Sequence, residues 1–192
     1  MYSPFQLGIR YLDWWLHASN GRGHGIHSPF VYAFLEDVLL DHRPRPIYEQ
    51  VEGLRSRLKR SGEMIEVLDL GAGSRTDNKR LRKVSDIART AAKPAKYGQL
   101  LHRMVQHFGC RQVMELGTSL GLTTCYLSAA VGDHGRVMTV EGAPAIARKA
   151  EAHFQELGLS NITQVVGDFD DRLHECLEAM PRPDLVYIDG NH

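Results

Sequence analysis

Residues Val113–Gly121 read Val-Met-Glu-Leu-Gly-Thr-Ser-Leu-Gly, and they join an apolar run to a glycine loop. The apolar run predicts a buried strand, and Leu122–Val131 predicts the helix that follows it. Gly117 lets the chain turn sharply with φ > 0, and Gly121 lets the helix pack close to the strand because no Cβ intervenes. A strand, a glycine loop and a helix in this order are typical of a pocket for a nucleotide-type cofactor.

A second strand with an acidic end completes this unit. Arg136–Val140 is rich in β-branched residues and is followed by Glu141. Glu141 lies about twenty residues beyond the glycine loop, where a doubly wound fold places a carboxylate for the ribose hydroxyls. Residues 161–169 and 184–192 predict two more strands. We therefore expect an α/β fold with a doubly wound, Rossmann-like, mostly parallel sheet, of which about four strands are present.

The spacing of the glycines separates two classes of cofactor. A dinucleotide fold uses Gly-x-Gly-x-x-Gly, so that a pyrophosphate can approach the backbone at the helix N-terminus. Here the loop is Glu115-x-Gly117-x-x-x-Gly121, with Thr118 and Ser119 between the glycines. This loop has no obvious place for a phosphate.

At this point the sequence resembles the class I S-adenosylmethionine-dependent methyltransferases, in which an acidic residue and Gly-x-x-x-Gly surround the methionine end of the cofactor. Residues 115–124, Glu-Leu-Gly-Thr-Ser-Leu-Gly-Leu-Thr-Thr, are most similar to the small-molecule O-methyltransferases of the catechol and caffeoyl-CoA type. Ala95–Leu101 is similar to the segment that leads into the first helix of those enzymes. With the third and fourth predicted strands, these motifs cover roughly residues 90–192 in the expected order.

The resemblance implies a binding site for S-adenosyl-L-methionine. Glu141 would bind the ribose, with Gly142 beside it in the cofactor site. Thr123 lies where related enzymes use a hydroxyl to hold the cofactor carboxylate. The residues expected around the amino-acid end are Glu115, Gly117, Thr118, Ser119, Gly121 and Thr123, and those expected at the adenine are Gly167, Asp168 and Phe169.

Asp189 is the expected catalytic residue, because active sites of open α/β sheets lie at the carboxyl ends of the strands. In the metal-dependent O-methyltransferases that the chain resembles, the corresponding Asp helps to bind Mg²⁺, which lowers the pKa of a catecholate oxygen. Asn191 and His192 replace a motif that usually continues to a catalytic Lys, and the remaining metal ligands would lie further downstream. His192 is a second candidate, as a general base, because a neutral imidazole titrates near neutrality.

Residues Val67–Ser74 contain a second glycine motif, Val-Leu-Asp-Leu-Gly-Ala-Gly-Ser. Charged residues dominate 75–89, and no β-rich run that ends in an acid follows them. We therefore predict that Gly71 and Gly73 form a turn in the N-terminal region. We also predict that Lys79–Thr90 is helical and too polar to be part of the core.

We divide the chain near residue 90, into a helical N-terminal extension (1–90) and a Rossmann-like methyltransferase domain (91–192). Apolar residues at helical spacing predict helices over 5–17, 29–40, 47–60 and 95–108. The domain would be incomplete after its fourth strand, as in a fragment of a longer protein or a truncated product. An edge strand exposed there would favour homodimerisation or aggregation.

Residues 20–27, Asn-Gly-Arg-Gly-His-Gly-Ile-His, separate the first two predicted helices. One interpretation is a connector between helices, whose glycines supply φ > 0. The alternatives are a flexible cover over the active site, or a role for His24 and His27 in binding a metal or the substrate.

Charge is unevenly distributed although the formal net charge is zero. Residues 43–103 hold 15 Lys and Arg against 7 Asp and Glu. A basic extension beside a methyltransferase domain can bind RNA, since Lys and Arg contact phosphates. The stretch lacks interleaved aromatic residues for base stacking, which favours a solvated helical face.

The sequence predicts neither a secreted protein, nor a membrane-spanning protein, nor a structural zinc site. Cys110, Cys125 and Cys176 are odd in number, well separated and in apolar contexts, which is typical of buried thiols in a reducing cytoplasm. The first residues show neither a basic stretch followed by an apolar core nor a small-residue cleavage site, and the sequence has no apolar run of about eighteen residues. We therefore expect a cytoplasmic protein without a membrane partner, and no structural zinc site.

Three hypotheses of function follow. The first is an S-adenosylmethionine-dependent methyltransferase that methylates an oxygen atom of a small molecule. The second is an RNA methyltransferase that uses the basic region 43–103. The third is a non-catalytic binding module in which the cofactor fold serves as a scaffold, since a fold alone does not fix a function.

Overall fold

The structure is a computed structural model that describes residues 8–9, 28–68 and 79–190 of the chain. By packing, the chain divides into two compact units, residues 1–41 and 42–192. No helix in the described parts of the chain is long and apolar enough to cross a membrane.

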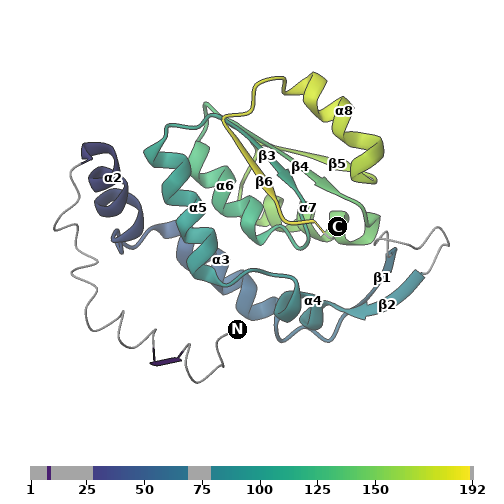
Figure 1. Cartoon of the computed structure of the whole chain (residues 1–192). Coiled ribbons are helices and arrows are strands. Elements are labelled where there is room, and N and C mark those ends of the chain that lie inside the picture. The colour runs from purple at the N-terminus through teal and green to yellow at the C-terminus, as the bar shows by residue number, and fades with distance from the viewer. Residues whose placement is uncertain (1–7, 10–27, 69–78, 191–192) are drawn as a thin grey trace. The chain divides into compact units, whose positions relative to one another are not determined.

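The first unit contains helix α2 (Pro29–Phe34), which continues as the short π-helical segment η1 (Leu35–Leu39) (Figure 1). The Ser28 Oγ accepts a hydrogen bond from the Val31 N–H at 3.4 Å and so caps the helix. These elements confirm the helix predicted over 29–40. Two other N-terminal predictions lie outside the described residues, apart from residues 8 and 9: the helix over 5–17 and the glycine-rich stretch 20–27.

The second unit is built on a four-stranded parallel sheet with the strand order β5-β4-β3-β6 (Figure 1). Its strands are β3 (Gln112–Leu116), β4 (Arg136–Glu141), β5 (Ile162–Val166) and β6 (Leu185–Ile188). The helices that connect them are α6 (Leu122–Val131), α7 (Pro144–Glu156) and α8 (Phe169–Ala179). All four strands were predicted from their apolar runs, and the doubly wound α/β fold is confirmed.

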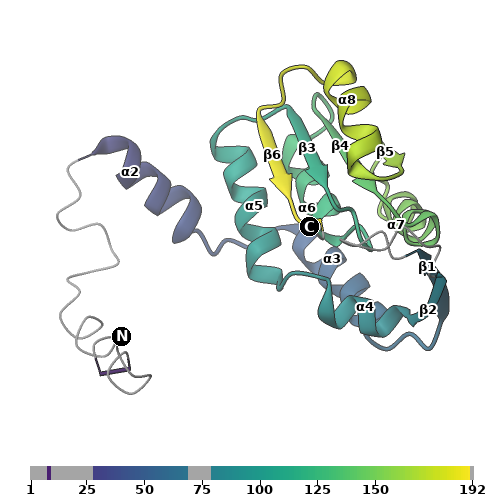
Figure 2. The same cartoon turned by 45° about the vertical axis from the view of Figure 1, so that its right-hand side comes forward.

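Apolar side chains alternate between the two faces of this sheet. On one face, Val113 and Val137 pack against α6 and against α5 (Ala95–His107). On the other face, Met114 and Met138 pack with residues of α8. Figure 2 shows α8 and α6 on opposite sides of the strands.

The strand order reverses at β3, because β4 and β5 lie on one side of it and β6 lies on the other. Such a reversal is a topological switch point, and ligands of open α/β sheets bind there, beyond the carboxyl ends of the strands. The glycine loop follows β3, and Asp189 follows β6. The fold therefore places both sequence motifs at one edge of the sheet.

The elements that precede the sheet are packed onto the same unit. They are α3 (Pro46–Leu58), β1 (Met64–Leu68), β2 (Lys79–Lys83) and α4 (Val84–Thr90). Apolar side chains of α3, β1 and α4 share one buried cluster with α6 and α7. By packing, residues 42–90 therefore belong with the sheet, and the domain limit expected near residue 90 stays a prediction.

The prediction for Lys79–Thr90 is wrong in two respects: its first half is not helical, and its helical half is part of the core, with Val84, Ile87 and Ala88 buried. Residues Lys79–Lys83 form β2, which pairs antiparallel with β1, and only Val84–Thr90 is helical. Pairing with β1 outweighs the polar composition of β2, because β preference depends on context more than on the residues themselves. Strand β1, which enters the second glycine motif, thus pairs with the next strand along the chain, while Gly71 and Gly73 lie outside the described residues.

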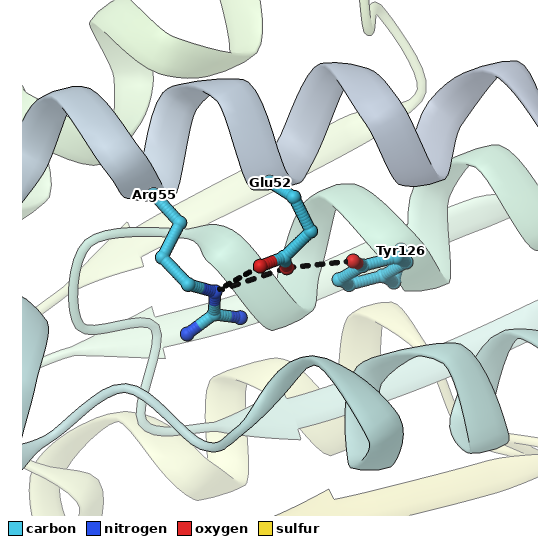
Figure 3. Close-up of polar contacts among 3 residues, drawn as sticks. All are labelled: Glu52, Arg55 and Tyr126. Atoms are coloured by element: carbon cyan, nitrogen blue, oxygen red, sulfur yellow. Dashed lines mark hydrogen bonds and ion pairs between the residues drawn. The ribbon is translucent and has the colours of Figure 1, made fainter.

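A buried polar group joins α3 to α6 (Figure 3). The Tyr126 hydroxyl of α6 donates to Glu52 Oε1 at 2.9 Å, and the Arg55 Nε donates to both Glu52 oxygens at 2.9 and 3.0 Å. Tyr126 is fully buried, and the Arg55 side chain is only 7% exposed. Burial and the nearby Glu52 charge both raise the pKa of Tyr126, so this hydroxyl acts as a neutral donor.

The ring of Tyr126 also determines how closely α5 approaches α6. A Cβ added at Gly98 of α5 would lie 2.4 Å from the Tyr126 Cδ2 atom. The absence of a side chain at residue 98 therefore permits this helix contact. In contrast, a Cβ added at Gly53 of α3 would meet no atom within 4 Å.

We expect Gly98→Ala and Gly53→Ala to change stability in opposite directions. Gly98→Ala should lower the free energy of unfolding by about 1–3 kcal/mol, because the added methyl overpacks the α5–α6 contact. Gly53→Ala should raise it by about 0.5–1 kcal/mol, because alanine is the better helix former and has open space here. Urea unfolding followed by circular dichroism measures both values. Equal effects of the two substitutions would contradict the close α5–α6 contact.

Candidate functional site

The glycine loop between β3 and α6 touches the end of β6. Gly117 has φ = 105°, and a Cβ there would lie 2.8 Å from backbone atoms of Asp189 and Gly190. The Asp189 N–H donates to the Leu116 carbonyl at 2.8 Å. The positive φ is as the sequence predicted for Gly117, and the structure adds that only a residue without a side chain fits at this crossing.

Gly121 has a different neighbour from the one predicted. Its φ is 77°, and a Cβ there would lie 2.5 Å from the Phe154 ring and 3.1 Å from the Ala150 Cβ. Both of these residues belong to α7. Gly121 thus allows α6 to begin close to α7, whereas the sequence analysis expected it to allow close packing on the strand.

Glu141, at the end of β4, is tied to the backbone on two sides. Its Oε2 accepts a hydrogen bond from the Ser119 N–H at 2.8 Å, and its Oε1 accepts one from the Ala143 N–H at 3.0 Å. Ser119 has φ = 49°, an uncommon value for a residue other than glycine. Burial raises the pKa of Glu141, while both backbone donors act to lower it. The carboxylate thereby holds the glycine loop against the turn that follows β4.

Glu115, at the end of β3, is completely buried among hydroxyl groups. Its Oε2 accepts hydrogen bonds from Thr124 at 2.5 Å and from Thr139 at 2.7 Å, and the Thr118 and Thr139 hydroxyls lie 2.6 Å apart. The Glu115 Oε1 atom has no hydrogen-bond partner among the described residues. Burial is the largest influence on this carboxyl and raises its pKa to about 7.

The turn after β5 lies beside Glu141 and beside the end of β6. Gly167 has φ = 148°, and its N–H donates to the Glu141 carbonyl at 3.0 Å. A Cβ added at Gly190 would lie 2.0 Å from the Phe169 ring, so this ring packs directly on the Gly190 backbone. The Asp168 Oδ1 caps α8 by accepting from the Asp170 N–H at 3.0 Å.

Asp189 is held by two side chains that the sequence analysis did not include in the site. Its Oδ1 lies 2.8 Å from the Lys93 Nζ, and its Oδ2 accepts a hydrogen bond from the Tyr187 hydroxyl at 3.0 Å. The hydrogen bond with Asp189 raises the pKa of Lys93. Lys93 stands in no recognisable motif, and it lies 96 residues before its partner in the sequence. Only the fold brings the two together.

The structure therefore gathers most of the predicted site at one edge of the sheet. The residues linked there by hydrogen bonds, strand pairing or close packing are Glu115, Gly117, Thr118, Ser119, Glu141, Gly167, Phe169 and Asp189. The roles predicted for Thr123 and Gly142 rest on their positions next to this group. The role of Asp168 in binding adenine stays a prediction beside its observed role as a helix cap. His192 lies outside the described residues.

The described residues do not make up a magnesium site. No group of three or more His, Cys, Asp or Glu side chains among them is arranged to hold a metal ion. Both carboxylate oxygens of Asp189 are already engaged, one of them by an ammonium group. The predicted Mg²⁺ site at Asp189 therefore does not fit the side chains that surround this residue.

We expect the ionisation of Glu115 to make stability fall as pH rises. Its pKa in the folded state, about 7, lies above the ordinary value of 4.5, so between these values the folded protein binds more protons than the unfolded chain. Glu115→Gln should remove this loss between about pH 5 and 8. Urea unfolding at several pH values measures it, and the difference between wild type and variant cancels other groups such as His153. Parallel pH profiles for the two proteins would rule out the raised pKa.

Comparison with known proteins agrees with this geometry. Residues 114–192 match the family model described as "Methyltransferase domain". The chain is 33% identical over 86 residues to the protein-L-isoaspartate O-methyltransferase of Fervidobacterium nodosum, covering 45% of this chain and 43% of that protein. It is 30% identical over 102 residues to the catechol O-methyltransferase of Mycobacterium tuberculosis, covering 50% and 44%. The chain thus spans less than half the length of these curated relatives.

Solved structures give the same result for the fold. Cofactor-bound Rv0187 from MTB has a TM-score of 0.54 and 26% identity, over 83% of this chain and 59% of that chain. An O-methyltransferase from Bacillus cereus in complex with SAH has a TM-score of 0.53 over 84% of this chain and 60% of that chain; at 21% identity it bears on the fold alone. The glycine loop, the switch point and these similarities agree, and they identify residues 114–192 as a methyltransferase domain with a Rossmann-like fold.

Proposed function

We propose that this chain binds S-adenosyl-L-methionine at the carboxyl ends of β3, β4 and β5, and that it transfers the methyl group to an oxygen atom of a small molecule. One observation carries the proposal furthest. The Glu141 carboxylate is fixed by backbone N–H groups of the glycine loop and of the turn after β4. The domain limits 91–192 remain part of this proposal, with residues 42–90 as its covering elements.

The arrangement of Glu141 suits a ribose. An ionised carboxylate offers about four lone-pair sites, and the Ser119 and Ala143 N–H groups use two of them. Two sites thus remain for the two neighbouring hydroxyls of a ribose. The carboxylate is also held in place before any ligand arrives, which lowers the entropic cost of binding.

Glu115 suits the amino-acid end of the same cofactor. Its Oε1 is a buried acceptor without a partner among the described residues, and such an atom is costly unless a donor reaches it. The ammonium group of a bound cofactor, directly or through a water molecule, would supply that donor. It would also favour the ionised form of Glu115 and lower the raised pKa.

Methyl transfer requires that the acceptor oxygen be aligned with the methyl group and that the proton of the acceptor hydroxyl be removed. The bound cofactor would supply an electrophilic methyl group on a positively charged sulfur. The protein would hold the acceptor oxygen in line with that methyl, so that a C–O bond could form as the C–S bond breaks and its electron pair passes to sulfur, while the proton of the acceptor hydroxyl passes to a base, for which Asp189 is the candidate among the described residues. Asp189 lies against the glycine loop at the end of β6, within reach of an acceptor bound beside the cofactor.

An oxygen acceptor is favoured by the relatives named above, since both curated relatives are O-methyltransferases. Between the two acceptors in their names, L-isoaspartate in a protein and a catechol, we favour a small molecule of the second kind. The match to the catechol enzyme extends over half of this chain, more than the match to the other relative.

Calorimetric titration of the wild-type chain with S-adenosylhomocysteine tests the cofactor assignment. The same titration of Glu141→Ala tests the assignment of Glu141 to the ribose. We expect micromolar binding by the wild-type chain. Because hydrogen bonds to a charged group contribute about 1.5–3 kcal/mol each, Glu141→Ala should weaken binding at least about tenfold.

Glu151→Ala is the matched control, because Glu151 is an exposed glutamate of α7 that contacts Gln155. Its affinity for S-adenosylhomocysteine should equal that of the wild type. Circular dichroism must show that all three proteins are folded. Absence of binding by folded wild type would reject the cofactor and favour the scaffold hypothesis, and an unchanged affinity of Glu141→Ala would reject the ribose assignment.

A further inference from the structure

A lysine from outside the matched domain reaches the reacting end of the site. Lys93 precedes Pro94, the residue that caps the N-terminus of α5, and its Nζ lies 2.8 Å from the Asp189 Oδ1. The family model begins at residue 114 and does not include Lys93. The Lys93 side chain is 48% exposed and that of Asp189 is 21% exposed, so the ammonium of this ion pair remains accessible while the carboxylate is more buried.

The position of Lys93 is set by the packing of α5. The close contact between Gly98 and the Tyr126 ring fixes this helix against α6. The same α6 begins at the glycine loop, which touches the Asp189 backbone through Gly117. The packing of α5 on α6 therefore positions the backbone near Lys93, and the contact of the glycine loop with β6 positions the backbone of Asp189.

The other oxygen of Asp189 is also engaged. Tyr187 stands two residues earlier on β6, and its hydroxyl donates to the Oδ2 at 3.0 Å. Burial is the main cause that raises the pKa of Tyr187, and the Asp189 charge adds to it, so this hydroxyl remains a proton donor. The carboxylate thus receives one charged and one neutral hydrogen bond.

These contacts conflict with a divalent cation at Asp189. Mg²⁺ binds carboxylate oxygens directly, in a strict octahedral arrangement. At Asp189 an ammonium already lies at hydrogen-bonding distance and would repel the metal ion, and the described residues supply no group of three metal-binding side chains.

We propose that Lys93 is a positioning residue of this site, whose ammonium group together with Tyr187 holds the Asp189 carboxylate and takes the place of a divalent cation. The role of this carboxylate in methyl transfer rests on the function proposed above. A lysine ammonium has three donors, and Asp189 uses one. The others can face the acceptor oxygen, where a positive charge favours the deprotonated form.

Magnetic resonance of the lysine side chains tests this proposal without knowledge of the acceptor. Reductive [¹³C]methylation labels each lysine of the full chain and keeps its charge. The Lys93 signal is identified by its loss in Lys93→Arg, and the signal of Lys96, which lies over the exposed Tyr97 ring at 4.9 Å, is identified in Lys96→Arg as the matched control.

We expect Asp189→Asn to shift the Lys93 signal and to leave the Lys96 signal in place. About 10 mM Mg²⁺, above the millimolar range of weak divalent-cation sites, should shift neither signal in the wild type. A saturable shift of the Lys93 signal by Mg²⁺, abolished in Asp189→Asn, would overturn the proposal, because the metal would then displace the lysine. No response of Lys93 to Asp189→Asn would also overturn it.

Titration with S-adenosylhomocysteine separates this inference from the proposed function. Lys93→Arg should bind it within about twofold of the wild type, a difference below 0.5 kcal/mol, because its ammonium lies against Asp189 and outside the cofactor-binding group. If the wild type fails to bind it, the proposed cofactor is wrong, whereas the lysine signals still report whether Lys93 or Mg²⁺ holds Asp189.

Discussion

The site depends on the contact between the glycine loop and the end of β6. At Gly117 two backbone segments cross with no room for a side chain, and the β3–β6 ladder runs up to this crossing. Because the two strands are parallel neighbours, their carboxyl ends must meet there. Glu115 enters the site from one strand and Asp189 from the other. The neighbouring pairs β3–β4 and β4–β5 then add Glu141 and Gly167 to the same edge.

The polar groups at this edge are stabilised in different ways. Glu141 is held by backbone N–H groups, and Asp189 by an ammonium and a phenol hydroxyl. Glu115 has only hydroxyl partners, and burial therefore dominates its protonation. These three carboxyl groups thus have different surroundings at one edge of the sheet. In the function proposed above, Glu141 and Glu115 would bind two ends of the cofactor, and Asp189 would lie at the acceptor.

Sequence reasoning could predict the parts of the fold whose signal is local. The β3 run, the positive φ at Gly117 and the place of Glu141 at the end of β4 agree with the local spacing that predicted them, whereas Gly121 packs on α7 and not on the strand. The strand β2 could not be predicted, because its five residues include four cations and owe their conformation to pairing with β1. His102 was missed for a related reason: it is buried in α5 against the Tyr48 ring, where a helix pattern favours apolar residues. Lys93 had no signal at all, since its partner is distant in the sequence and only the assembled fold shows the pair.

The basic strand β2 has a consequence for how the protein behaves in a crowded solution. It lies in a sheet of two strands among the described residues, so a row of its backbone N–H and C=O groups has no strand beside it. Free edges of this kind invite the strand of another molecule, and lysine or arginine side chains along them oppose that encounter by like-charge repulsion. The basic region 43–103 suggested a nucleic-acid partner, and β2 is part of it. We expect the positive charge of β2 also to oppose edge-to-edge association between copies of the chain.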